Sequence, residues 1–223
     1  MGNDMDEFIV KDCLLLTRMS GLPPAFNLRE LRDRITACSN DVLHHHFFET
    51  SLRATFDDPE YRNDFAVWAK EKLADRILAE RLGIIDPYEI ESITLLRQLV
   101  LDIIEDRLSE LSPWVPAVRP GEEFFFMEAI VIAFETDQRI RRPSELADAI
   151  EEMTNGCIFF HFLEALRRPP VHMDDFTAWL QQFGSSGEPF ARAISSIDFY
   201  FKSLPALRDE LSRTLRTVKV AQS

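Results

Sequence analysis

The strongest constraint on this chain is an internal repeat. Residues 30–53 match residues 145–168 at a constant offset of 115, with nine identities in 24 positions. Two unrelated segments of average composition would share roughly one or two. The repeat predicts two copies of one structural unit, residues 7–112 and 122–223, joined by the Pro-rich link 113–121.

A second pair of motifs extends the match in the same order. Asp64-Phe65-x-x-Trp68 in the first copy corresponds to Asp175-Phe176-x-x-Trp179 in the second. The chain also carries 18 Phe in 223 residues, which is about twice the usual share. Since buried Phe contributes strongly to a core, we expect the two copies to pack about a pseudo-two-fold axis as one merged globular body.

The hydrophobic pattern predicts a mainly helical protein with a minor strand component. An apolar segment rich in aromatic and β-branched residues opens each copy and favours a strand, at 8–16 and 124–134. Expected helices cover 41–53 and 156–168, begin again at Asp64 and Asp175, and end the copies at 91–111 and 205–218.

Separate signals place the start of the first helix in each copy. Asn27 and Glu30 have the spacing of a helix cap followed by a stabilising carboxylate. Pro143 occupies the matching position of the second copy, in the first turn, where its missing N–H is harmless. The two signals agree on one boundary.

A narrow polar stripe runs along the otherwise apolar second helix of each copy, and it is the leading candidate site. The stripe comprises His46, Glu49 and Arg53 in the first copy and His161, Glu164 and Arg168 in the second. Unpaired polar groups in a core cost roughly 1–3 kcal/mol each, so the stripe is either satisfied internally or faces a cleft. The structural interpretation pairs Glu49 with Arg53 and Glu164 with Arg168 as i,i+4 salt bridges beside a core histidine.

The repeated Asp and Trp also have two interpretations. Asn63 and Asp174 immediately precede apolar periodic runs, as helix caps do, and the aromatic residues that follow would anchor the first turn in the core. The functional interpretation places the Asp64 carboxylate against His46 or a ligand, with Trp68 as an aromatic wall. The second copy offers Asp175 and Trp179 for the same roles.

Metal binding is the alternative use of these residues. His46 and Glu49, and likewise His161 and Glu164, could ligate a divalent metal or act as a base and its orienting carboxylate. The run His44-His45-His46 does not add to this, because successive helical side chains point about 100° apart. We therefore expect no cofactor, with a divalent metal as the alternative.

Composition limits the partner and the compartment. Twenty-five Lys and Arg against 38 Asp and Glu give a net charge of −13, which speaks against nucleic acid and anionic membranes as partners. A protein, a small-molecule ligand or another copy of the chain remain. Three cysteines without C-x-x-C spacing suggest neither disulfides nor a zinc site and favour the cytoplasm.

Two strings resemble a known family. The strings are His46-Phe47-Phe48-Glu49-Thr50 and the segment 59–68, Pro-Glu-Tyr-Arg-Asn-Asp-Phe-Ala-Val-Trp. They are similar to a bacterial family described only as a domain of unknown function, and the resemblance runs through most of the chain, including 13–34 and 122–126. The resemblance implies a bacterial, cytoplasmic protein. It assigns no activity to any residue.

The sequence leaves open whether the protein is an enzyme. The interpretation that needs fewest assumptions is a non-catalytic binding or interaction protein with a ligand or partner groove between the two copies. The alternative is a metal-dependent hydrolase in which His46, Glu49 and Asp64, with their second-copy equivalents, hold divalent ions that activate water.

Overall fold

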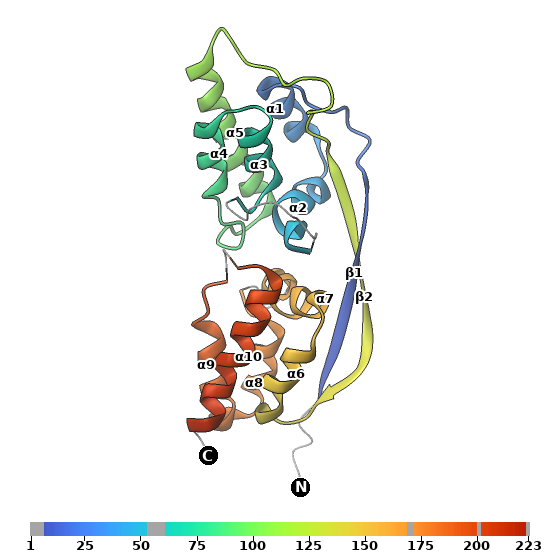
Figure 1. The fold of residues 1–223 in the computed structure, drawn as a ribbon, viewed down its shortest axis with the longest axis vertical. Coiled ribbons are helices and arrows are strands. Elements are labelled where there is room, and N and C mark those ends of the chain that lie inside the picture. Colours follow the sequence, from blue (N-terminus) through green and yellow to red (C-terminus); the bar gives the residue numbers. More distant parts are fainter. Residues whose placement is uncertain (1–6, 53–60, 169–171, 200–201, 222–223) are drawn as a thin grey trace. The chain divides into compact units, whose positions relative to one another are not determined.

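The fold is mainly helical with a minor strand component, as the sequence predicts. In the described residues, the two strands form a two-stranded antiparallel sheet (Figure 1). This computed structural model describes residues 7–52, 61–168, 172–199 and 202–221. The strands are β1 (Phe8–Met19) and β2 (Met127–Ile140). The α-helices are α1 (Leu28–Ala37), α2 (Asn40–Phe48), α3 (Asp64–Glu71), α4 (Arg76–Gly83), α5 (Ile93–Leu111), α6 (Leu146–Glu152), α7 (Asn155–Ile158), α8 (Asp175–Gln181), α9 (Glu188–Ser195) and α10 (Leu204–Ala221).

The chain forms two compact units. One consists of Leu15–Ile130, and the other combines Met1–Leu14 with Val131–Ser223. Each strand therefore begins in one unit and ends in the other, so each unit contains part of both strands.

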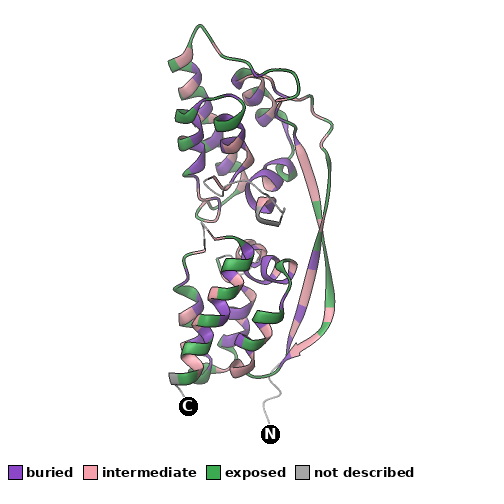
Figure 2. Ribbon diagram, viewed as in Figure 1, coloured by how far each residue is buried: buried purple, intermediate pink, exposed green. Residues whose placement is uncertain are grey.

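The first unit contains α1 to α5. Helix α5 packs against α1, α2 and α4, and α3 packs against α4. The core of this unit includes Leu31, Phe65 and Ile104, all fully buried, together with Phe124 and Phe126 from the segment that leads into β2. Figure 2 shows that the buried positions of these helices lie on their inner faces.

The second unit contains α6 to α10. Helix α10 packs against α6, α7 and α9, and α8 packs against α9. Its core includes Phe159, Phe176 and Leu211. Phe8, at the start of β1, packs against this core. The centroid of its ring lies 5.3 Å from that of Phe176 and 5.6 Å from that of Trp179.

The predicted helix starts are confirmed. The Asn27 side chain accepts a hydrogen bond from the Glu30 N–H and caps α1, while Pro143 begins the 3-10 turn Pro143–Glu145 that leads into α6. Asn63 caps α3 and Asp174 caps α8. The polar residues before each apolar run thus act as caps.

The described parts of the helices predicted at 41–53 and 156–168 are helical, but their second halves are not α-helical. Helix α2 ends at Phe48 and continues as the 3-10 helix Glu49–Leu52. In the second unit α7 is followed by a π-helix, Phe159–Glu164, and a 3-10 turn, Ala165–Arg167. Because 3-10 and π turns rotate side chains by different amounts per residue than an α-helix, the stripe expected from a helical wheel is not preserved.

Candidate functional site

His46, at the end of α2, bridges a side chain and a strand. Its Nδ1 atom lies 2.6 Å from Asp64 Oδ2, and its Nε2 atom accepts a hydrogen bond of 3.0 Å from the Met127 N–H. Asp64 is the first residue of α3, and Met127 is the first residue of β2. The ring packs against Phe65 and Phe124 and is almost completely buried.

His161 makes the same set of contacts in the other unit. Its Nδ1 atom lies 2.7 Å from Asp175 Oδ2, and its Nε2 atom accepts a hydrogen bond of 2.7 Å from the Lys11 N–H of β1. Its ring packs against Phe8 and Phe176. The interpretation that sets Asp64 against His46 thus agrees with the geometry, and it holds equally for Asp175 and His161.

These contacts determine the tautomer of both rings. An Nε2 atom that accepts from a backbone N–H carries no proton, so the ring proton is on Nδ1 and is donated to the carboxylate. Both nitrogens are therefore engaged. The backbone N–H groups that donate to the two imidazoles belong to the strands of a two-stranded sheet. The outward N–H groups of such a sheet have no neighbouring strand to bond to. Each His–Asp pair accordingly anchors a strand to a helical unit.

Glu49 does not lie beside His46 as a partner. Its carboxylate lies 2.8 Å from His45 Nδ1 and 3.4 Å from His44 Nδ1, and it is 3% exposed. Burial alone would raise the pKa of Glu49, but the hydrogen bonds from His44 and His45 outweigh burial and lower it to about 2. Glu49 is therefore a buried carboxylate held ionised by two imidazoles.

His45 is the residue that the sequence analysis missed. It is fully buried, and its Nε2 atom has no hydrogen-bond partner. The signal in the sequence is the i,i+4 spacing of His45 and Glu49, which is the same spacing as that of Glu49 and Arg53.

The predicted salt bridge between Glu164 and Arg168 is wrong. Glu164 pairs with Arg167 at 2.8 Å, whereas Arg168 donates to Asp175 at 2.9 Å and to the Phe160 carbonyl at 2.8 Å. The cause is the π-helix followed by a 3-10 turn, which moves Arg168 off the face of Glu164. Arg53, the expected partner of Glu49, lies outside the described residues.

Both tryptophans of the candidate site are core residues. Trp68 is buried and donates its indole N–H to the Glu122 carbonyl at 2.8 Å. Trp179 is buried between Phe8 and Phe183. The structural interpretation of the Asp-Phe-x-x-Trp motifs therefore agrees with these positions.

The predicted metal ligands are each engaged elsewhere. His46 and His161 use both ring nitrogens, Glu49 faces His44 and His45, and Glu164 faces Arg167. Within the part of the chain that the structure describes, no three His, Cys, Asp or Glu side chains are placed to hold one metal ion. The same described residues contain no helix that is both long and apolar enough to cross a lipid bilayer.

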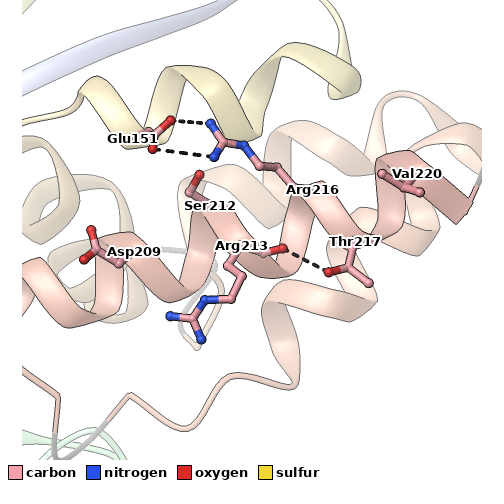
Figure 3. A pocket seen from close by; sticks show the side chains of 7 residues that line it. All are labelled: Glu151, Asp209, Ser212, Arg213, Arg216, Thr217 and Val220. Atoms are coloured by element: carbon pink, nitrogen blue, oxygen red, sulfur yellow. Dashed lines mark hydrogen bonds and ion pairs between the residues drawn. The ribbon is translucent and has the colours of Figure 1, made fainter.

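A ligand-sized opening lies within the second unit, along α10 and the end of α6 (Figure 3). Its volume is about 820 Å³, within the range of about 300–1,000 Å³ that small-molecule sites occupy. Arg216 pairs with Glu151 of α6, and the Ser212 hydroxyl donates to the Ala147 carbonyl at 2.9 Å. Arg213 points away from the Glu151–Arg216 pair, and none of the described carboxylates pairs with it.

Comparison with known proteins identifies a solved structure and a family model that each match almost the whole chain. The structure of OrfY from Thermoproteus tenax has a TM-score of 0.78 and 29% identity to this chain, and the match covers 97% of each chain. No match was found among curated proteins. Residues 5–216 match the family described as "Family of unknown function (DUF5752)". With almost its whole length matched, the chain belongs to this family of unknown function.

Proposed function

We propose that the protein is a non-catalytic binding protein. Support comes from the His46–Asp64 and His161–Asp175 pairs, whose ring nitrogens hold strands in place. A general base needs a nitrogen that can reach a substrate, and these imidazoles would have to break a buried hydrogen bond first. The polar stripe therefore acts as a structural feature, and ligand binding takes place elsewhere.

The observation that carries the proposal is the opening along α10. Arg213 is exposed there and lacks a carboxylate partner among the residues described, whereas Arg216 is neutralised by Glu151. An uncompensated guanidinium at the edge of a ligand-sized opening favours a carboxylate or phosphate group. The ligand class that fits is a small molecule with one anionic group.

Thermal-shift and calorimetric titrations with inorganic phosphate and acetate test this proposal. Binding should raise the melting temperature of the full chain, and Arg213→Gln should remove that increase. Arg192→Gln is the matched control, since Arg192 is an exposed helical arginine away from the opening. The proposal fails if neither anion binds, or if both variants respond as the original chain does.

We also infer that the chain arose by duplication of one unit. The support is that equivalent residues make equivalent contacts: His46 and His161 each bond an Asp at a helix start and a backbone N–H of a strand. The helix pairs α1–α5 and α3–α4 in one unit have counterparts in α6–α10 and α8–α9 in the other. A cytoplasmic location follows from the cysteine pattern and remains part of the same proposal.

A metal-dependent hydrolase is the second candidate function. The observation that favours it is His45, whose Nε2 atom is buried without a hydrogen-bond partner while Nδ1 contacts Glu49. A carboxylate that orients an imidazole in this way is typical of both bases and metal ligands. Elemental analysis of the purified chain tests it: stoichiometric Zn, Mn or Fe that His45→Gln removes would favour hydrolysis over simple binding.

A further inference from the structure

Two oppositely charged side chains of α10 line the opening of Figure 3 without pairing with each other. Asp209 and Arg213 lie about 6 Å apart along the helix axis, at the i,i+4 spacing that favours an ion pair. Among the described residues Arg213 nevertheless has no carboxylate partner, and the one cation that contacts Asp209 is Arg208, whose Nε lies 3.5 Å from its carboxylate. Both charged groups therefore keep hydrogen-bonding capacity for a ligand.

The other polar side chains that line the opening are already engaged. Arg216 pairs with Glu151, and the Ser212 hydroxyl donates to a backbone carbonyl of α6 at 2.9 Å. The Thr217 hydroxyl donates to a backbone carbonyl of its own helix at 3.1 Å. A ligand in the opening thus meets one carboxylate and one guanidinium group that are ready to bind it.

The charges that line the opening balance one another. Two carboxylates and two guanidinium groups line it, and the Glu151–Arg216 pair takes up one of each. A purely anionic ligand would satisfy Arg213 but would also meet the Asp209 carboxylate, on a chain with a net charge of −13. A ligand with one ammonium and one carboxylate group has no net charge, so it can bind both side chains without that repulsion.

The opening ends on an apolar side chain. Val220 is 77% exposed in the last turn of α10, about 10 Å along the helix axis from Arg213. Thr217 lies between the two on the lining of the opening. Since burial of apolar surface is favourable, an apolar group of the ligand would gain free energy by lying along this end of the helix.

We propose that the ligand is a free α-amino acid with an apolar side chain, an inference that rests on the binding function proposed above. Arg213 binds the carboxylate through its planar guanidinium group, and Asp209 binds the ammonium group. The apolar side chain lies along α10 toward Thr217 and Val220. The two charged groups of an α-amino acid are bonded to the same carbon, so side chains from successive turns of one helix can hold both.

NMR titrations of the full chain with three related compounds test the proposal. They are phenylalanine, hydrocinnamate, which lacks the ammonium group, and phenethylamine, which lacks the carboxylate. Phenylalanine should bind about threefold to fivefold more tightly than hydrocinnamate, the gain that an exposed ion pair gives. Without a group that recognises ammonium, hydrocinnamate would bind at least as tightly, because its uncharged end is easier to remove from water. Phenethylamine should also bind more weakly than phenylalanine, since it offers Arg213 no carboxylate.

Asp209→Asn should remove the preference for phenylalanine over hydrocinnamate and leave the binding of hydrocinnamate at least as tight. The Asp209 side chain is 63% exposed, so the substitution leaves the core unchanged. Asp102→Asn is the matched control and should keep the preference, because Asp102 is an exposed aspartate of α5 in the other unit.

Val220→Ser tests where the apolar side chain lies. Phenylalanine should bind more tightly than glycine to the original chain, and Val220→Ser should reduce this difference about twofold by removing apolar contact area. A difference that Val220→Ser leaves unchanged would contradict the proposed direction of the side chain.

The outcomes separate this inference from the proposed function. If hydrocinnamate and phosphate bind but phenylalanine binds no more tightly than hydrocinnamate, the amino-acid ligand is wrong and the anion site stands. A preference for phenylalanine that survives in Asp209→Asn also overturns the inference. If neither phosphate nor any of the carboxylates binds, the binding function itself fails.

Discussion

The imidazole of His161 accepts a hydrogen bond of 2.7 Å from the backbone N–H of Lys11, 150 residues earlier in the chain. This bond joins the first strand to the second helical unit. Its counterpart joins His46 to Met127 across 81 residues. Each helical unit thus holds one strand through a buried histidine.

Replacement of His161 by Ala should lower the free energy of unfolding by about 2–4 kcal/mol. The substitution leaves the Lys11 N–H and the Asp175 carboxylate without their partner and opens a cavity beside Phe8. Urea unfolding measures the loss. His172→Asn is the control, since His172 is exposed, and should change stability by less than about 0.5 kcal/mol. A loss as small as that of the control would show that the link is not structural.

Asp174→Asn should stabilise the protein by about 1 kcal/mol at neutral pH. Burial raises the pKa of Asp174, which caps α8. At the corresponding cap of α3, Asn63 keeps the cap bond and also donates to the Leu82 carbonyl at 2.9 Å. An amide at position 174 retains the cap and removes a buried charge.

The pH dependence of this gain follows from the direction of the shift. Because the pKa of Asp174 is higher in the folded than in the unfolded chain, stability falls as pH rises between those two values. The gain from Asp174→Asn should therefore shrink as pH falls to about 4, near the ordinary Asp value. Thermal melts between pH 3.5 and 7 measure it. Asn63→Asp is the matched reverse variant and should destabilise; a pH-independent difference would contradict the burial argument.

Glu49→Gln should make the free energy of unfolding depend less on pH in the acid range. The pKa of Glu49 is lowered to about 2, so its ionised form favours folding above the ordinary Glu pKa, and this contribution is lost as pH falls from about 4.5 toward 2. Glu49→Gln has no carboxylate at this position, so its stability cannot lose this contribution as pH falls. Chemical unfolding of both proteins between pH 2 and 5 measures the slopes. Glu188→Gln, at an exposed site, is the control and should keep the pH dependence of the original chain. If Glu49→Gln also kept that pH dependence, Glu49 would not be an ionised carboxylate that stabilises the fold.

The sequence predicted the secondary structure around the site better than the contacts of the site. Strand propensity and capping signals located β1, β2 and the starts of α1, α3 and α8, because these depend on local chemistry. The pairing of Arg168 with Asp175 was missed because the π-helix changes the angular spacing. The pairing of Glu49 with His45 was missed because the i,i+4 partner of Glu49 was taken to be Arg53.

The strand contacts of the two histidines could not be predicted for a different reason. Each joins residues far apart in sequence, and nothing in the pattern of β1 indicates that the Lys11 N–H points at a histidine. The repeat did indicate that the two histidines occupy equivalent positions. The functional interpretation also anticipated the contact of Asp64 with His46, whereas the strand N–H groups that the two imidazoles accept from were not predicted.

Gly156→Ala should destabilise the protein, although Ala favours helices over Gly by about 1 kcal/mol. Gly156 lies in α7 against β1, and a Cβ atom there would come within 2.6 Å of the Cys13 carbonyl oxygen and still closer to the Asp12 carboxylate. Since the carbonyl belongs to the backbone, the strand or the helix must shift, which costs about 1–3 kcal/mol. Urea unfolding of Gly156→Ala, with Asp12→Ala as a second change, measures this. Removal of the Asp12 side chain should recover only part of the loss, because the backbone contact remains. A stability gain close to the helix-propensity value would instead mean that α7 does not lie against β1.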